Sequence, residues 1–172
     1  MVRARTILAA LLTVALAGPA AAQNRKLIGS YKDWDAFVLV NKGKKSCFMV
    51  SVPKDSAPKN VRRGKVYITI THRPAVRVVG EISVVTGYPY KPDSVARAVI
   101  DGRRGFEMFT SGDAAWAYDP KQDKTMVAAM KRGGRLVIRG VSRRGTKTTD
   151  RYSLAGFTAA YKAISAACKI SP

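Results

Sequence analysis

The sequence predicts a mainly β domain, an antiparallel β-sandwich or a barrel-like sheet, with two short peripheral helices of which the C-terminal one packs on the sheet. Three observations support this prediction. Short β-branched runs recur along the chain, separated by Gly, Pro and charged residues. Residues 65–71 (KVYITIT) alternate apolar and polar side chains, which is the period of a strand with two different faces. Only two segments carry a helical pattern.

Several of the predicted strands are joined by short turns rich in Gly and basic residues. Such turns are expected at 41–45, 102–105 and 142–146. Longer loops are expected at 53–64 and 87–92, where prolines interrupt the strand pattern. The predicted strands are residues 34–40, 46–52, 65–71, 76–86 with a bend at Gly80, 95–101, 106–109, 115–118, 135–141 and 147–154.

The first helix is expected over residues 119–131, because two consecutive glycines follow it and end it. The second is expected over residues 156–168. Its apolar side chains are spaced four, three and four residues apart and therefore share one face. They are Phe157, Tyr161, Ile164 and Cys168. This face turns Cys168 inward, towards the strand that carries Cys47.

The first 22 residues have the pattern of a secretory signal peptide. Two arginines precede an apolar run at 7–17, which is shorter than the roughly 20 residues that cross a bilayer. The alanines at 20–22 predict cleavage between Ala22 and Gln23, with an uncleaved anchor as the alternative. Polar residues 23–33 are expected to form an N-terminal arm, and residues 34–172 a single domain. No later segment has the length and hydropathy to span a membrane, so we expect a periplasmic, outer-membrane-associated or secreted protein.

The chain contains two cysteines, Cys47 and Cys168, one near each end of the expected domain. In an oxidising compartment, two cysteines are most simply interpreted as one disulfide. The alternative is a pair of buried thiols that act as small hydrophobic side chains.

The composition is strongly basic, with 31 Lys and Arg against 11 Asp and Glu and a net charge of +20. A hydrophobic fraction of 47% excludes a disordered polycation. The single histidine and two distant cysteines exclude most protein-built zinc sites, and no cofactor is expected. Such a charge attracts polyanions and anionic membrane surfaces. Nucleic acid is not expected as a partner, because the leader predicts export.

Pairs of cations followed by Gly recur at the turns, where Gly supplies the backbone freedom and the cations stay in water. Each pair alone is explained as a solubilising turn, but together they are candidate anion-binding residues. The candidates are Arg62, Arg63, Arg103, Arg104, Lys131, Arg132, Arg143 and Arg144. The expected partner is an anionic envelope surface (lipopolysaccharide or acidic lipid) or a protein.

No motif of an enzyme stands out. Residues 140–148 (GVSRRGTKT) nearly match the phosphate-binding loop, but Thr146 separates the second Gly from the Lys, and the segment joins two strands. His72 has no nucleophile elbow to accompany it, so a catalytic triad is not indicated. An envelope hydrolase would need His72 beside Asp or Ser in a cleft.

A ligand- or peptide-binding module is the alternative function. A pocket between the sheet and a helix would have aromatic walls, for which Tyr88, Tyr90, Trp116 and Tyr118 are the candidates. Core or loop packing is the simpler explanation for each ring. A concave cluster of these rings would favour a ligand site over binding by charge alone.

Several segments, in order, resemble the invasion-associated locus B family of bacterial exported proteins. The segments are Trp34-Asp35, residues 46–49 (SCFM), 125–133 (TMVAAMKRG), 135–140 (RLVIRG), 144–146 (RGT) and 150–157 (DRYSLAGF), followed by the closing helix. The resemblance covers residues 34 to 168.

The resemblance implies a small, β-rich, periplasmic or outer-membrane-associated domain without an established enzymatic activity or cofactor. The family name records an association with host-cell invasion. Because this chain lacks the additional central cysteine pair of some relatives, only the Cys47–Cys168 pairing is left. The family motif is mainly fold-defining, so it supplies no functional site residue. We therefore expect a non-enzymatic envelope protein.

Overall fold

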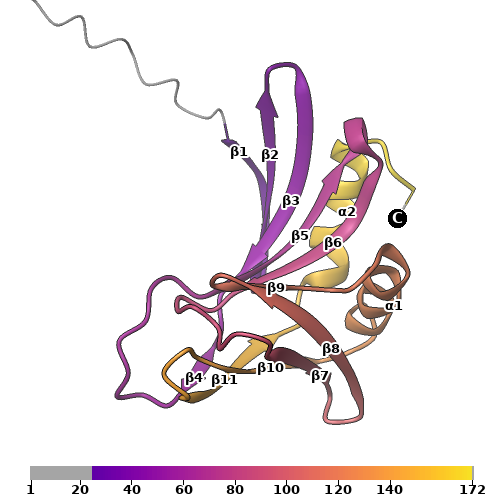
Figure 1. The fold of residues 1–172 in the computed structure, drawn as a ribbon. Coiled ribbons are helices and arrows are strands. Elements are labelled where there is room, and N and C mark those ends of the chain that lie inside the picture. Colours follow the sequence, from indigo (N-terminus) through magenta and orange to yellow (C-terminus); the bar gives the residue numbers. More distant parts are fainter. Residues whose placement is uncertain (1–24, 172) are drawn as a thin grey trace, which may run out of the picture.

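The structure is a computed structural model that describes residues 25–171. It contains one antiparallel sheet of 11 strands in the order β1-β2-β3-β5-β6-β9-β8-β7-β10-β11-β4 (Figure 1). The strands are β1 Arg25–Tyr31, β2 Trp34–Asn41, β3 Lys44–Ser51, β4 Asp55–Ala57, β5 Tyr67–Arg73, β6 Val78–Val85, β7 Val95–Ile100, β8 Arg104–Ser111, β9 Ala114–Trp116, β10 Arg135–Val141 and β11 Lys147–Ser153. The helices are η1 Pro74–Val76, α1 Pro120–Met130 and α2 Phe157–Ala167.

The mainly β class, with a C-terminal helix packed on the sheet, is confirmed. The sheet is not closed into a barrel, because β1 and β4 are its two ends. It bends where β9 pairs with only three residues of β6, so that β1, β2, β3, β5 and β6 form one half and the remaining strands the other (Figure 1). Both α-helices lie on the same, inner side of this bend.

Two strands lie where the sequence suggested irregular structure. The expected arm at 23–33 contains β1, which pairs with β2 from Arg25↔Leu39 to Tyr31↔Trp34. The expected loop at 53–64 contains β4, whose three residues pair with β11. Both lie at the ends of the sheet and lack a regular apolar alternation by which to recognise them: β1 is polar and has a register shift between Leu27 and Gly29, and β4 has only three residues and pairs with a distant strand.

Helix α1 begins where Asp119 accepts a hydrogen bond from the backbone N–H of Gln122, with Pro120 at the first position. The helix buries its apolar face through Met126, Val127 and Met130. It ends before the glycines at 133–134, as its sequence predicts.

Helix α2 packs on β1, β2, β3 and β5. Its predicted apolar face is correct, since Phe157, Tyr161, Ile164 and Cys168 are all buried. Phe157 meets Trp34 edge to face, with ring centroids 5.0 Å apart. The indole N–H of Trp34 donates to the carbonyl of Ser153, so the start of β2 is held against the end of β11.

No helix among the described residues is long and apolar enough to cross a membrane. The segment at 142–146 that partly resembles a phosphate-binding loop is a hairpin turn, in which the Ser142 hydroxyl accepts from the backbone N–H of Thr146. The hairpin prediction is therefore confirmed.

Candidate functional site

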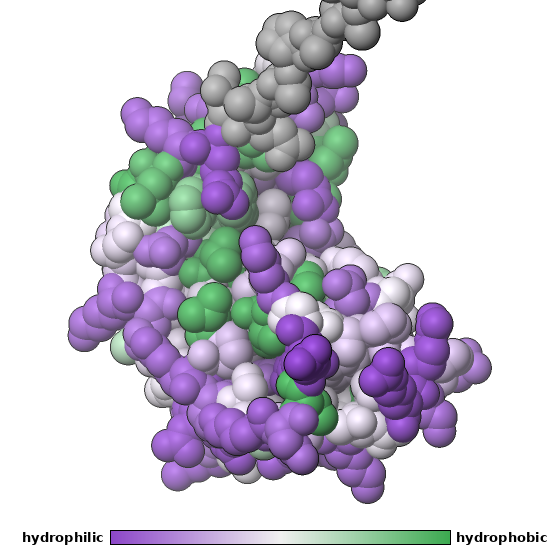
Figure 2. Space-filling model, turned by 90° about the vertical axis from the view of Figure 1, so that its left-hand side faces the viewer, coloured by the Kyte–Doolittle hydropathy of each residue, from purple (hydrophilic) through white to green (hydrophobic). Residues whose placement is uncertain are grey.

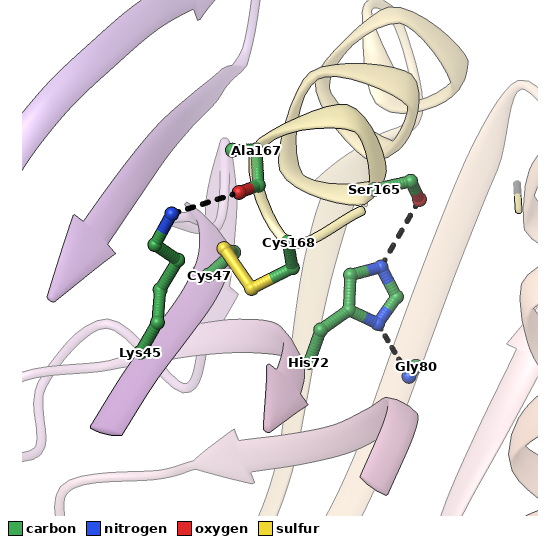
Figure 3. Close-up of a disulfide and its surroundings, with 7 residues drawn as sticks. All are labelled: Lys45, Cys47, His72, Gly80, Ser165, Ala167 and Cys168. Atoms are coloured by element: carbon green, nitrogen blue, oxygen red, sulfur yellow. Dashed lines mark hydrogen bonds between the residues drawn. A yellow bond between two sulfur atoms is a disulfide. The ribbon is translucent and has the colours of Figure 1, made fainter. Parts of the chain in front are cut away.

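The two cysteines form the predicted disulfide, with their Cα atoms 5.9 Å apart. Cys47 lies in the middle of β3, and Cys168 caps the C-terminal end of α2 (Figure 3). The Lys45 ammonium donates to the carbonyl of Ala167 at 3.4 Å, close to the disulfide. The disulfide therefore fixes the end of α2 to the sheet.

His72 lies beside the disulfide, as the cross-strand partner of Cys47, and is fully buried (Figure 3). Its Nδ1 accepts from the backbone N–H of Gly80 at 2.9 Å, and its Nε2 lies 3.1 Å from the hydroxyl of Ser165. In the neutral ring, Nε2 therefore carries the proton and donates to Ser165. Burial, followed by the charge of Lys131, lowers the pKa of His72 to about 4.

The proximity of His72 and Ser165 is not the arrangement that a hydrolase requires. A base that activates a serine needs an unprotonated nitrogen facing that serine, and here that nitrogen faces Gly80 instead. Both side chains also have no exposed surface through which a substrate could reach them. This pair is consequently a packing contact between β5 and α2.

Arg63 does not belong to an exposed basic turn. Its guanidinium makes two hydrogen bonds to the buried carboxylate of Asp150, at 2.9 and 2.6 Å, and a third to the carbonyl of Thr86. The Arg63 side chain is 8% exposed, so it is not available to bind an external anion. The sequence alone did not separate it from Arg62, which is exposed.

Tyr88 and Tyr90 also belong to this buried cluster. Arg63 lies over the ring of Tyr88, whose hydroxyl hydrogen-bonds to Thr148. The ring of Tyr90 packs edge to face on Tyr88 and is 4% exposed. These two rings fill the interior, so they do not form the walls of a ligand pocket.

Two of the predicted basic turns lie at opposite ends of the same strands. The turn before Arg104 is at one end of β7 and β10, and the turn with Arg143 and Arg144 is at the other. Arg104 does not belong with the exposed cations of these turns. Its guanidinium lies over Phe106, whose partner Ala98 is on the buried face of β7.

Exposed cations on the strands connect the two turns. Arg97 and Arg139 are direct cross-strand partners on the outer face of β7 and β10. The alternation of the strands places Arg135 and Lys147 on that face as well. We call this surface the basic band, and it consists of Arg97, Arg103, Arg135, Arg139, Arg143, Arg144 and Lys147. In Figure 2, hydrophilic side chains predominate along the lower rim, where β4 and β11 lie in Figure 1.

The other half of the sheet has an outer face of different character. Leu27, Phe37 and Phe48 form a cross-strand row there, on the side opposite α2. Leu27 is 50% exposed, and hydrophobic side chains gather in the upper and middle part of Figure 2. Arg25 covers part of this row by lying over the ring of Phe37.

A groove of about 1190 Å³ lies between β6, β8 and α1. One wall is a row of three aromatic rings, in which Phe109 stacks on Trp116 at 5.5 Å and lies 5.8 Å from Tyr118. Trp116 and Tyr118 are two of the predicted wall residues, and Phe109 was missed. Its pairing with Trp116 joins β8 to β9 and could not be read from local spacing.

The groove also contains the predicted cations Lys131 and Arg132. The Lys131 ammonium lies 4.2 Å from the ring centroid of Tyr161, and burial lowers its pKa. Lys131 and Arg132 are therefore separate from the basic band and belong to this groove, which we call the aromatic groove.

Asp123 lies in the groove and was also missed by the sequence analysis. It is 7% exposed, and its Oδ1 accepts from the backbone N–H of Ile82 at 2.9 Å. Burial, which outweighs this hydrogen bond, raises the pKa of Asp123 to about 6, and the charges of Glu81 and Asp119 add to the effect. The predicted cleavage site at Ala22 and Gln23 lies outside the described residues.

Comparison with known proteins agrees with the resemblance seen in the sequence. The family model described as invasion associated locus B (IalB) protein matches residues 34–165. The crystal structure of invasion associated protein b from Bartonella henselae is similar, with a TM-score of 0.57 and 19% sequence identity. The alignment covers 84% of this chain and 99% of that chain, and at this identity it shows a shared fold. No curated protein matches this chain.

Proposed function

This chain belongs to the invasion associated locus B (IalB) family, and from that premise we propose that it is an exported, non-enzymatic protein of the cell envelope. We further propose that its basic band binds a phosphate-bearing anionic surface of the envelope. The N-terminal leader pattern and the disulfide support export, because disulfides persist mainly in oxidising compartments.

The pairing of Arg97 with Arg139 carries the binding proposal. Like charges directly opposite each other are unfavourable in a sheet, so the contact between Arg97 and Arg139 does not itself stabilise the isolated fold. Among the described residues, neither guanidinium takes part in an ion pair, although Glu107 lies opposite Arg97 on β8. A phosphate between the two arginines would relieve their repulsion and accept hydrogen bonds from both.

The position of the band supports an extended anion. Cations occur at both ends of β7 and β10 and in the middle of these strands, on a sheet face that neither α-helix covers. A surface of many phosphates can contact all of them at once. The binding energy would then come from many weak contacts, and it should decrease steeply as salt increases.

The test is co-sedimentation of the chain that starts at Gln23 with vesicles. Three preparations are compared at low and high salt: phosphatidylcholine alone, phosphatidylcholine with phosphatidylglycerol, and lipopolysaccharide. The second and third distinguish the two sources of phosphate. We expect binding to at least one of them, no binding to phosphatidylcholine alone, and a loss of binding at high salt.

Two charge-matched variants decide whether the band is responsible. Arg97→Glu with Arg139→Glu should weaken binding at least tenfold. Lys42→Glu with Lys44→Glu changes the net charge equally at the distant β2–β3 turn and should weaken binding less than threefold. Equal losses in both variants would show diffuse attraction by net charge, and binding that is unaffected by salt would refute the electrostatic mechanism.

Export has its own test. Expression of the full chain in a Gram-negative host should yield a periplasmic protein whose N-terminal residue is Gln23. Ala22→Arg, which removes the small residue before the cleavage site, should accumulate the uncleaved precursor. Recovery of uncleaved wild-type protein in the cytoplasm would contradict the proposal.

A further inference from the structure

One edge of β6 is only partly paired. β5 pairs with β6 along its length, whereas β9 covers only Ser83–Val85 on the other side. After Trp116 the chain leaves the sheet and enters α1. In the part of the chain that the structure describes, no strand continues the line of β9 along Val78–Ile82.

The aromatic groove occupies this open strand position. Five consecutive residues of the chain, 77–81, line it on the side of β6. The aromatic row of Phe109, Trp116 and Tyr118, one side of α1 along its length and Tyr161 of α2 line the remaining sides. Residues 78–81 belong to β6, and four residues of strand span about 13 Å, so the open edge has room for a short extended segment. The volume of about 1190 Å³ exceeds the usual range for a small-molecule site.

Two backbone N–H groups along this edge are already engaged, because that of Gly80 donates to His72 and that of Ile82 donates to Asp123, so a bound segment would donate its own N–H groups to acceptors of the edge. The amide of Ile82 points away from β5 and donates to Oδ1 of Asp123, where the amide of a continuous sheet would donate to a neighbouring strand. The second carboxylate oxygen of Asp123 has no hydrogen-bond partner among the described residues. An N–H group of a bound segment can donate to it.

The charges around the groove favour an acidic occupant. Glu81 is paired with Arg73, and Asp119 caps the start of α1. The rim cations Arg77, Lys124 and Arg132 are exposed and, within the described residues, form no ion pair. The aromatic row adds an apolar surface, since Phe109 is 39% exposed and Tyr118 53%.

We propose that the groove binds an extended, acidic peptide segment of a partner protein, which adds as a strand to the open edge of β6. Backbone hydrogen bonds would hold the segment, its apolar side chains would contact the aromatic row, and its carboxylates would meet the rim cations. This site is distinct from the basic band, so either proposal can fail without the other.

The test starts from random heptapeptides displayed on phage and selected on the chain that starts at Gln23. Selected peptides should be enriched in Asp and Glu and in β-branched residues. Their synthetic forms, labelled with a fluorophore, are then measured by fluorescence anisotropy. An absence of enrichment, or enrichment in basic peptides, would refute the proposal.

Variants then locate the binding site. Lys124→Glu with Arg132→Glu should weaken peptide binding at least tenfold, whereas Lys42→Glu with Lys44→Glu should change it less than threefold. Tyr118→Ala removes an exposed ring and should weaken binding at least threefold while the circular dichroism spectrum stays unchanged. Unchanged affinity in both groove variants would overturn the proposal. Arg97→Glu with Arg139→Glu should leave peptide binding intact, which separates this site from the basic band.

Backbone methylation tests the mode of binding. In an added strand, alternate amides face the edge of β6, so N-methylation at every second residue should abolish binding in one register and spare it in the other. Equal tolerance of both registers would show that side chains alone hold the peptide, and the added strand would be wrong.

Discussion

At the scale of single residues, two buried titratable side chains have pKa values displaced so that both favour the neutral form. His72 on β5 has its pKa lowered to about 4, and Asp123 on α1 has its pKa raised to about 6. The folded chain therefore binds fewer protons than the unfolded chain at His72 and more at Asp123. Between about pH 4 and pH 6, acidification costs stability at His72 and adds stability at Asp123, so the two effects oppose each other.

Asp123→Asn should separate these effects. Asparagine keeps an oxygen for the N–H of Ile82 and removes the buried charge, so at pH 7.5 the free energy of unfolding should rise by about 1–3 kcal/mol. Between pH 6 and pH 4 the variant should lose stability more steeply than the wild type, by up to about 1.4 kcal/mol per pH unit, because the slope from His72 is then unopposed. Urea unfolding at several pH values measures both, and parallel pH profiles would contradict the assignment.

The ion pair of Arg63 with Asp150 is a second test at this scale. Asp150 is fully buried, and the Ser56 hydroxyl also donates to it. Asp150→Leu leaves the guanidinium without its partner and should cost about 3–5 kcal/mol. Adding Arg63→Met to this variant should recover part of the loss, because the buried charge is then gone. A double variant whose loss equals the sum of the two single losses in urea unfolding would show that the pair is not coupled.

At the scale of elements, the turn that leads into α2 explains why the family motif defines the fold. Gly156 has φ of +89°, and a Cβ atom there would lie 1.8 Å from the backbone oxygen of Tyr31. The turn therefore presses directly against the end of β1. The flanking residues Leu154 and Phe157 are buried, so the motif docks helix and strands together.

Gly156→Ala should destabilise the protein by clearly more than Gly145→Ala. Gly145 has a similar φ of +83° but open space around its Cβ position. The loss of stability in Gly145→Ala therefore measures the backbone strain alone, which costs about 1 kcal/mol. The excess at Gly156 should exceed about 2 kcal/mol, because backbone atoms must move apart. Thermal unfolding of the two variants measures the difference, and equal shifts would show that the turn can relax.

The disulfide acts on the same helix from its other end. It closes a loop between residues 121 positions apart, for which the chain-entropy model gives about 4–5 kcal/mol. Replacing both cysteines by serine should lower the free energy of unfolding by up to this amount. The wild type should show the same loss in reducing agent, whereas the serine variant should be insensitive to it. A wild-type protein unaffected by reduction would contradict a stabilising role.

At the scale of the whole molecule, few carboxylates balance the cations. Four of the 11 acidic residues (Asp33, Asp55, Glu81 and Asp150) account for all five ion pairs among the described residues, against 31 Lys and Arg in the sequence. Repulsion between the remaining cations works against the compact state.

Salt should therefore stabilise the protein. Raising NaCl from 20 to 300 mM shortens the screening length, and a gain of about 1 kcal/mol would raise Tm by about 2–4 °C. Differential scanning calorimetry measures the shift, and an equal change in osmolality with sucrose controls for solvent effects. A Tm that falls with NaCl would show that ion pairs outweigh the repulsion.

The sequence predicted most of the strands, both α-helices and the disulfide, because each has a local or compositional signal. The alternation at 65–71 and the stripe that contains Phe157 are such signals. It did not predict β1 or β4, and it grouped Arg63 with exposed cations. The strand β1 is polar and irregular although it pairs with its neighbour β2, whereas the pairing of β4 and the burial of Arg63 depend on residues far apart in the chain.

The sequence by itself determined that this chain builds a basic, mainly β domain, because periodicity and composition follow from neighbouring residues. The tertiary structure decided which cations share a surface, since the register of β7 with β10 brings Arg97 beside Arg139. It also decided that Phe109 and Trp116 line one groove with Asp123. These groupings depend on where the sheet bends and how its strands pair, and that geometry is set by packing of the whole chain.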